Sequence, residues 1–489
     1  MSNLISLKCG VSAHQPSKYI LDEKEFERVS ALARIEIEDA QIELERAHNA
    51  ANGMGKGAEG AEADDADEDG DEDAWVDEED APMEVDGDVQ ADAPEKEDDL
   101  AQYNLYKYDE DDDAEDDERS ELEILPTDNL LVTAKTEDDV SQLEIYVYDE
   151  SQDNLYTSHP GPSSEMQSDT SPKFGNNITF GTLDPEIKIW SLGVMESMYP
   201  DMILGRPDKT AAHVPVPAGT GKKKRKKTKH CPSSDTYHVD AVLGLSWNRT
   251  HRHMLASASV HRTVKPWDLS RPIVDGEGVI RSFGVHKDKV QAVQWNEKEP
   301  TVRLSGSYDR TVRVFDSRAS DTGVGAVLGA DVKALRWDPW ETHAFYVSSL
   351  ENGLVLNFDA RALPMDMKYP SPARFTLSAH DGAVSALDVS PLLRGCICTG
   401  GMDKLVKVWN VDQTTGGKPA VSMVASRDME VGEVFSAVFS PDNPLTIAAA
   451  GSKAKLQIWD VGANSGTRRA FASKLSEAGR VLKKKKAEG

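Results

Sequence analysis

Seven short stretches rich in β-branched and aromatic residues recur from about residue 123 onward, and each has an aromatic residue near its end. They are LEIYVYD, PEIKIWSL, RTVKPWDL, RTVRVFDS, GLVLNFDA, KLVKVWNV and KLQIWDV, with aligned aromatic residues Tyr148, Trp190, Trp267, Phe315, Phe358, Trp409 and Trp459. Apart from one gap of about 77 residues, the interval is about 42 to 51 residues, the period of a WD-repeat blade. The repetition predicts an all-β fold, a seven-bladed WD-repeat β-propeller.

The same polar residues recur within the repeats. His286 and His380 stand in a loop before an apolar strand, and Asp309 and Asp403 stand in the tight turn before the last strand. His and Asp in these places can hydrogen-bond to each other and to neighbouring hydroxyls inside a blade. We assign His286, Asp309, His380, Asp403 and Trp409 to a structural network. A catalytic pair would occur once rather than in every repeat, so we expect no catalytic residue.

The formal net charge is -30, and nearly all of it lies in one segment. Between Glu62 and Glu118 there are about 30 Asp and Glu residues against only Lys96 and Lys107. Such a composition cannot bury enough apolar surface to offset chain entropy, so residues 53–120 are predicted to be a disordered acidic segment. Its aromatic stretch YNLYKYDEDD is typical of a short docking peptide.

Composition also divides the rest of the chain. Residues 1–52 are an N-terminal extension, in which LDEKEFERVSALARIEIEDAQIELERA places apolar residues at three-to-four spacing and predicts an amphipathic helix. Residues 121–465 hold the propeller, and residues 466–489 form a basic C-terminal tail. The exceptional gap between repeats is explained by an inserted loop, residues 203–235.

The inserted loop contains the run GKKKRKKTKH. Its basic residues are Lys222, Lys223, Lys224, Arg225, Lys226, Lys227 and Lys229, and the tail has a second run of Lys483, Lys484, Lys485 and Lys486. Three functions fit such runs: a nuclear import signal, contact with an RNA or DNA backbone, and an intramolecular partner for the acidic segment. The import signal is the favoured interpretation.

Other motifs exclude several classes of function. There is no Gly-rich phosphate loop, HExxH or G-x-S-x-G with triad partners, so we expect no enzymatic activity, cofactor or small-molecule substrate. Four scattered cysteines indicate a reducing compartment, and Cys396 and Cys398 are predicted to be core residues rather than metal ligands. No apolar run approaches the roughly 18 residues of a membrane span, so no membrane partner is expected.

The order of several stretches resembles the periodic tryptophan proteins, a WD-repeat family of nucleolar ribosome-assembly factors. The stretches are SKYILDEKEFERVSALA, YNLYKYDEDDD, PTDNLLVTAKTEDDVSQLEIYVYDE, FGTLDPEIKIWSL, HVDAVLGLSWN, SRDMEVGEVFS and GSKAKLQIWDV. The resemblance implies a non-enzymatic scaffold of the nucleus and nucleolus that acts in large (60S) subunit precursor assembly and rRNA processing. Its partners would be the pre-ribosomal particle, through rRNA and assembly factors or basic ribosomal proteins.

Two alternatives stay open. An acidic segment beside a propeller also suits a chromatin or histone-binding regulator of ribosomal DNA transcription. The third candidate is a substrate receptor of a cullin-type ubiquitin ligase, because FDSR with Arg318 and FDAR with Arg361 resemble the paired Asp-x-Arg adaptor boxes of such receptors. Separately, Ser120 in DDERSELE is a phosphorylation candidate for an acid-directed kinase.

The chain departs from the family pattern in two blades. HPGPSSEMQSDTSP reads as a loop where the family has two strands, which predicts that blade two is incomplete, unless residues are missing from the sequence. In ASASVHRTVKPWDL, His261 replaces the usual turn Asp, and Pro266 removes a hydrogen-bond donor from the final strand. Blade three is therefore expected to be weaker than its neighbours.

Overall fold

The computed structural model describes residues 4–6, 17–18, 26, 129–137, 140–149, 154–160, 167–171, 177–181, 185–191, 194–195, 200–205, 235–271, 278–318, 323–365, 367, 369–412, 419–477 and 479. The chain divides into two compact units, Met1–Leu21 with Glu121–Gly489, and Asp22–Ser120. In the second unit the structure describes Phe26, which is helical and has an exposed side chain. The rest of the predicted helix, the acidic segment and the docking peptide lie outside the described residues.

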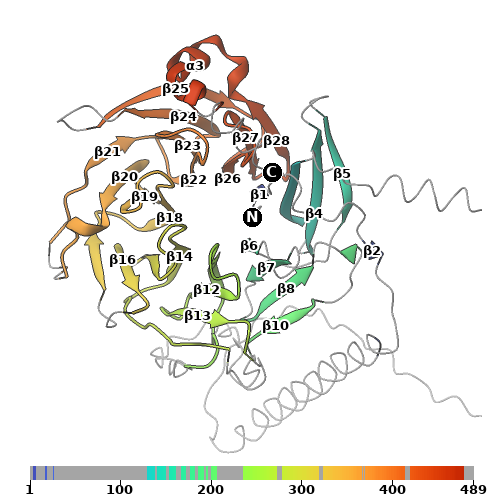
Figure 1. Ribbon diagram of the computed structural model, residues 1–489, viewed down its shortest axis with the longest axis vertical. Coiled ribbons are helices and arrows are strands. Elements are labelled where there is room, and N and C mark those ends of the chain that lie inside the picture. The colour runs from blue at the N-terminus through green and yellow to red at the C-terminus, as the bar shows by residue number, and fades with distance from the viewer. Residues whose placement is uncertain are drawn as a thin grey trace, which may run out of the picture. The chain divides into compact units, whose positions relative to one another are not determined.

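Among the described residues, the first unit holds seven antiparallel sheets of three or four strands, which we number as blades one to seven (Figure 1). From the innermost strand outward, blade one is β1 (Leu4–Ser6), β3 (Asn129–Glu137), β4 (Val140–Asp149) and β5 (Asn154–Pro160). Blade two is β6 (Gln167–Ser171), β7 (Asn177–Gly181), β8 (Ile187–Ser191) and β10 (Met202–Leu204). Blade three is β11 (Val242–Trp247), β12 (Met254–Ser259) and β13 (Val264–Asp268).

The C-terminal blades follow the same order. Blade four is β14 (Val290–Trp295), β15 (Val302–Ser307), β16 (Thr311–Asp316) and β17 (Val324–Val327). Blade five is β18 (Val332–Trp337), β19 (Ala344–Ser349), β20 (Leu354–Asp359) and β21 (Phe375–Ser378), with a short 3-10 helix at Ala360–Ala362. Blade six is β22 (Val384–Val389), β23 (Cys396–Gly401), β24 (Leu405–Asp412) and β25 (Ala420–Asp428). Blade seven is β26 (Val434–Phe439), β27 (Thr446–Gly451) and β28 (Leu456–Asp460).

The innermost strands close a ring around a central channel. Strands β6, β11, β14, β18, β22 and β26 contact one another in that order, and β1 contacts both β26 and β6. Outside this ring, β2 (Ser17–Lys18) pairs in parallel with β9 (Val194–Met195). The predicted seven-bladed propeller is confirmed, and the N-terminal strand β1 is one of its parts although the sequence placed it in an extension.

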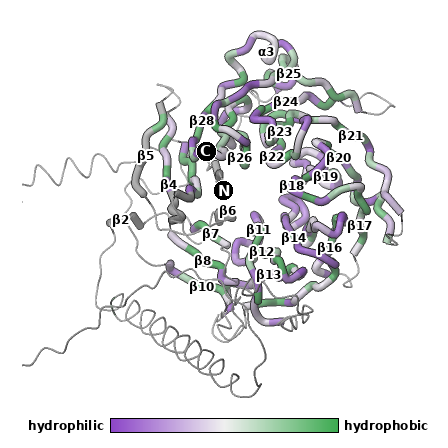
Figure 2. Tube along the Cα trace, turned by 180° about the vertical axis from the view of Figure 1, so that it is seen from behind, coloured by the Kyte–Doolittle hydropathy of each residue, from purple (hydrophilic) through white to green (hydrophobic). Residues whose placement is uncertain are grey.

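The aromatic residue that defines the repeat packs each blade against the blade before it. Among the described residues, seven buried clusters each join two neighbouring blades. Trp190 lies in the cluster between blades one and two, and Trp409 in the cluster between blades five and six. Removing such a ring from a core costs about 3–5 kcal/mol. In the tube view, hydrophobic residues recur along the strands of successive blades (Figure 2).

Blade two corrects one prediction. The stretch HPGPSSEMQSDTSP is not simply a loop, because its residues Gln167–Ser171 form β6. β6 pairs in antiparallel register with β7, where Ser168 faces Phe180. Blade two therefore has four strands. The polar sequence QSDTS gives no sign of a strand by itself, and the pairing with the buried strand β7 determines its conformation.

Blade three shows the effect of Pro266. Among the described residues, its third strand β13 has no fourth strand beside it but only two isolated bridges, Val264 to Phe283 and Trp267 to Val279. On this outer edge Val264 and Phe283 exchange two hydrogen bonds, whereas the Pro266 carbonyl accepts one from the Ile280 amide and Pro266 has no N–H to return. The N–H that Pro266 lacks would face the outer edge of β13, where a fourth strand would pair.

The predicted basic tail begins as ordered structure. A 3-10 helix at Val461–Ala463 leads into α3 (Ser465–Ala470), and the side chains of Thr467 and Phe471 are fully buried. Lys474 lies 2.8 Å from Asp412 of blade six and is part of an ion pair. This part of the tail packs against the propeller and is not a free basic segment.

Candidate functional site

Blade six contains a chain of hydrogen bonds that runs from its core to its surface turn. The Trp409 indole Nε1 donates to Thr399 Oγ1 (2.9 Å), which lies 2.8 Å from His380 Nε2. His380 Nδ1 is in turn 2.9 Å from Asp403 Oδ1. Burial opposes ionisation of Asp403, but hydrogen bonding and the charge of His380 outweigh it, and the pKa of Asp403 is lowered. The His and Asp of this blade are occupied with each other.

Blade four repeats the network with one change. His286 Nδ1 lies 3.1 Å from Asp309 Oδ2, and His286 Nε2 lies 2.8 Å from Ser305 Oγ. The Thr311 hydroxyl donates to Asp309 Oδ1 at 2.6 Å, and the backbone amide of Lys287 donates to Oδ2 at 2.8 Å. Phe315 stands where blade six has Trp409, so this blade has no indole N–H to reach its Ser.

Blade three contains the same chain of contacts with a histidine at its outer end. The Trp267 indole donates to Ser257 Oγ (2.7 Å), and Ser257 lies 2.5 Å from His238 Nε2. His238 Nδ1 then lies 2.6 Å from His261 Nε2, where the other blades have a carboxylate. All three networks lie inside their blades, which leaves no free His–Asp pair in these blades for acid–base chemistry.

The two adaptor-box candidates have the same geometry on adjacent blades. Arg318 forms a bidentate pair with Asp316, with Nε to Oδ1 at 3.0 Å and Nη2 to Oδ2 at 2.7 Å. Arg361 and Asp359 repeat both distances. The two guanidinium groups are largely exposed, at 72% and 67%. Each is fixed in orientation by its Asp and still presents its outer edge to solvent.

Other described residues give no sign of metal or thiol chemistry. Cys396 and Cys398 lie fully buried in the cluster between blades six and seven, and burial raises the pKa of both thiols. Within the described ranges, no group of three or more His, Cys, Asp or Glu residues is arranged to hold a metal ion. In the same part of the chain, no helix is long and apolar enough to cross a membrane.

Comparisons with known proteins extend over nearly the whole chain. The WD domain, G-beta repeat family matches residues 278–316 and 372–410, each of which spans the outer edge of one blade and the first three strands of the next, blade four and blade six. An uncharacterized WD repeat-containing protein of Schizosaccharomyces pombe is 35% identical, covering 98% of this chain and 92% of the relative. Periodic tryptophan protein 1 of Saccharomyces cerevisiae is 30% identical, covering 95% and 88%. The chain belongs to the periodic tryptophan protein 1 family.

A further family relative is the periodic tryptophan protein 1 homolog of Drosophila melanogaster, 26% identical over 74% of this chain and 73% of its own length. In this member of the periodic tryptophan protein 1 family, three of the predicted sites lie outside the described residues: the basic run Lys222–Lys229, the tail run Lys483–Lys486, and Ser120. The structure describes the ends of the inserted loop. It leaves blade two after Gly205, just beyond β10, and re-enters at Asp235 before β11.

A set of contacts that was not predicted from the sequence links inner strands in this periodic tryptophan protein 1 family member. Polar side chains next to the end of three inner strands accept from the backbone of the next blade: Trp295 N donates to Ser246 Oγ (3.0 Å), Trp337 N to Gln294 Oε1 (2.8 Å) and Phe439 N to Asp388 Oδ2 (2.9 Å). Between blades five and six, Arg336 Nε donates to Asp388 Oδ1 at 3.1 Å. The recurring endings LSW, VQW, LRW and LDV are the signal that could have revealed them.

Proposed function

We propose that this protein is a non-enzymatic scaffold of the nucleus and nucleolus that acts in assembly of the large ribosomal subunit precursor. The observation that carries the proposal is the family membership, because the similarity includes the propeller and the segments on both sides of it. A seven-bladed disc with loops on two faces offers broad surfaces for proteins and RNA. The His–Asp pairs that recur in blades four and six are hydrogen-bonded inside those blades, which favours binding over catalysis.

Charge supports the choice of a ribonucleoprotein partner. The loop between Gly205 and Asp235 has seven basic residues among the eight positions from Lys222 to Lys229, and the Glu62–Glu118 segment has the opposite charge. Basic runs bind phosphates without sequence preference, and an acidic segment binds basic ribosomal proteins. A particle of RNA and basic proteins has partners for both.

Crosslinking the full chain to RNA in cells tests the proposal. We expect crosslinks on the large-subunit precursor RNA. Changing Lys223, Lys224, Arg225 and Lys226 to Ala should reduce them, provided that the variant has an unrelated import signal so that nuclear entry is kept. The matched control is the double change Arg318→Ala and Arg361→Ala, which also removes positive charge but should leave the crosslinks intact.

Two other outcomes would replace the proposal. Recovery of core histones without precursor RNA would favour the chromatin alternative. Co-purification of a ligase adaptor with the wild type, and its loss with Arg318→Ala and Arg361→Ala, would favour the ubiquitin-ligase receptor. Such an adaptor would contact these two exposed guanidinium groups.

The acidic segment provides a second test, in vitro. If it competes with phosphates for the basic runs, deleting Glu62 to Glu118 should strengthen RNA binding and steepen its loss with salt, because each phosphate contact releases counterions with a slope of about -0.7 to -0.9. Equal affinity and equal slope for the full chain and the deletion would reject this competition.

A further inference from the structure

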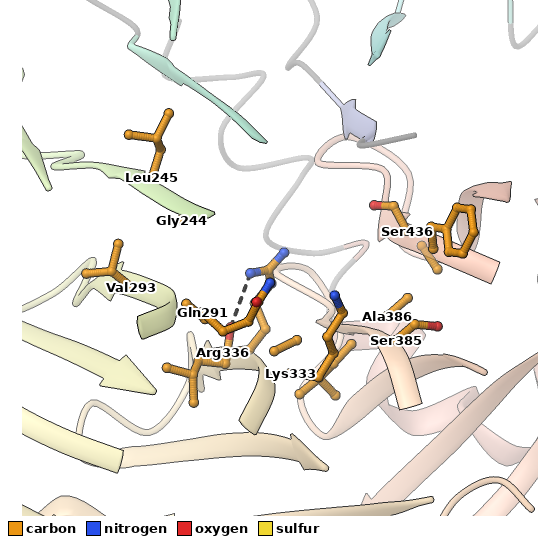
Figure 3. A pocket seen from close by; sticks show the side chains of 15 residues that line it. Gly244, Leu245, Gln291, Val293, Lys333, Arg336, Ser385, Ala386 and Ser436 are labelled. Carbon is orange, nitrogen blue, oxygen red and sulfur yellow. Dashed lines mark hydrogen bonds between the residues drawn. The ribbon is translucent and has the colours of Figure 1, made fainter. Parts of the chain in front are cut away.

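The central channel of the propeller contains a cavity of about 180 Å³, between the inner strands of blades three to seven. Its lining includes Gln291, Lys333, Arg336 and Ser436 (Figure 3). Since one water molecule takes roughly 30 Å³ of liquid, the space is on the order of six waters, which is enough for a small ionic group and its nearest waters.

A β-bulge accounts for the place of Lys333. The pairing of β18 with β19 shifts register between Val332 and Ala334, so Lys333 is the extra residue in its strand. Gln291 and Ser385 have the same bulged position in blades four and six. A bulge redirects a side chain that regular alternation would send elsewhere. Three neighbouring blades thus bring an amide, an ammonium and a hydroxyl to the channel lining.

The charge on the inner strands that line this cavity is not balanced. Among the described residues, none forms a hydrogen bond or ion pair with the Lys333 ammonium, and its pKa is lowered by burial. The inner strands β11, β14, β18, β22 and β26 contain one carboxylate, Asp388, and it already accepts from Arg336 Nε and the Phe439 amide. A half-buried cation without a partner is costly, and an anion would remove this cost.

Unused hydrogen-bond donors lie around this cation. Arg336 uses Nε for Asp388 and Nη1 for the Leu335 carbonyl, which leaves Nη2 without a partner among the described residues. The side chains of Gln291 and Ser436 are likewise unpaired within that part of the chain. Figure 3 shows Lys333 and Arg336 projecting into the same space. We propose that the channel binds a phosphate group through Lys333, Arg336 and Gln291.

The arrangement favours phosphate over a carboxylate because phosphate has more oxygen acceptors and carries up to about two negative charges at neutral pH. A wider cavity of about 640 Å³ shares Leu245, Val293 and Arg336 with the channel cavity, so the two are adjacent. Inorganic phosphate would occupy only the channel cavity, whereas the organic group of a phosphomonoester would extend into the wider cavity. The proposal does not depend on the ribosomal function.

Thermal unfolding of the full chain tests the site. We compare the wild type, Lys333→Gln and the control Lys455→Gln, which removes the same charge from an exposed turn of blade seven. Each is measured in sodium chloride, sodium phosphate and phosphoserine at matched ionic strength. Phosphate in excess of its Kd should raise the midpoint of the wild type and of Lys455→Gln by about 2 °C, and should not raise that of Lys333→Gln.

The outcomes are distinct. A larger shift with phosphoserine than with inorganic phosphate would identify the natural ligand as a phosphomonoester, and the reverse would identify the free ion. Equal shifts in all three proteins, or no shift with either compound, would overturn the proposal. In chloride alone Lys333→Gln should be at least as stable as the wild type, because it removes a buried unpaired charge, and Lys333→Arg should keep the phosphate response.

Discussion

Blade three and blade six have the same network in the same place, but the two networks end in different chemistry. In blade six the chain runs Trp409, Thr399, His380, Asp403 and ends on a carboxylate. In blade three it ends on a second histidine, His261. The outer edges differ as well: β24 pairs with the nine-residue strand β25, whereas β13 has two isolated bridges. The propeller fold thus tolerates the loss of both the carboxylate and the fourth strand within one blade.

The difference shows what the carboxylate contributes. Burial, followed by the charges of His261 and Lys265, lowers the pKa of His238 well below its ordinary value. Burial and Lys265 lower the pKa of His261 to about 4, against an opposing effect of Asp240, and burial lowers that of Lys265 to about 8. The blade-three network is therefore held together by neutral hydrogen bonds, and it contains no carboxylate to balance the charge of a proton added to one of its histidines.

The largest expected effect concerns the carboxylate itself. Asp403→Ala should destabilise the protein by about 2–3 kcal/mol, because His380 loses a charge-assisted partner inside the blade. His261→Ala, the matched change in blade three, should cost about 1 kcal/mol because it removes a neutral partner. Urea unfolding at neutral pH measures both. Equal costs would show that the carboxylate has no special role.

Acid should destabilise blade three more than blade six, because the pKa values of its two histidines are lowered further. The pKa of His261, about 4 in the folded chain, lies below its unfolded value of about 6.5, so its contribution to stability is present above pH 6.5 and is lost as the pH falls toward 4. In blade six, burial also lowers the pKa of His380, but the hydrogen bond and the charge of Asp403 oppose this shift, so the loss of stability below pH 6.5 is smaller. The contribution of Asp403, whose pKa is lowered, is lost only below the ordinary range of an aspartate. The variant His261→Asp should therefore lose less stability than the wild type between pH 7.5 and 5.5.

The control for this comparison is His251→Asp, which makes the same change of residue at an exposed position of blade three. Its loss of stability on acidification should match that of the wild type. If His261→Asp also matched the wild type, the His238–His261 contact would not be the source of acid sensitivity.

The smallest expected effect is at Pro266. Pro266→Val restores an N–H on the outer edge of β13, and this gain is offset in part because proline restricts the unfolded chain. The change in stability should be below about 1 kcal/mol. Amide hydrogen exchange is the sensitive measurement: the Ile280 and Phe283 amides should exchange more slowly in the variant. Unchanged exchange would mean that the proline is not what limits the fourth strand.

The repeat could be predicted from the sequence because one large buried aromatic residue per blade sets the period, as at Trp190 and Trp409. The replacement of the turn Asp by His261 was equally visible. Strand β1 was not, because its three residues pair with a strand more than a hundred positions later and have no periodic pattern. Nor was Lys333, since a bulge and not strand alternation places it in the channel.

Amide hydrogen exchange, measured on blades three and six in one experiment, tests most directly whether the polar network and the outer edge set the stability of a blade. Blade three should be less stable than blade six because its network lacks a carboxylate and because, in the part of the chain that the structure describes, its outer edge has two bridges in place of a strand. We expect the amides of β12 and β13 to exchange faster than those of β23 and β24 at pH 7.5, and the difference in opening free energy to grow at pH 5.5 after correction for intrinsic rates. Equal protection of the two blades at both pH values would contradict the claim.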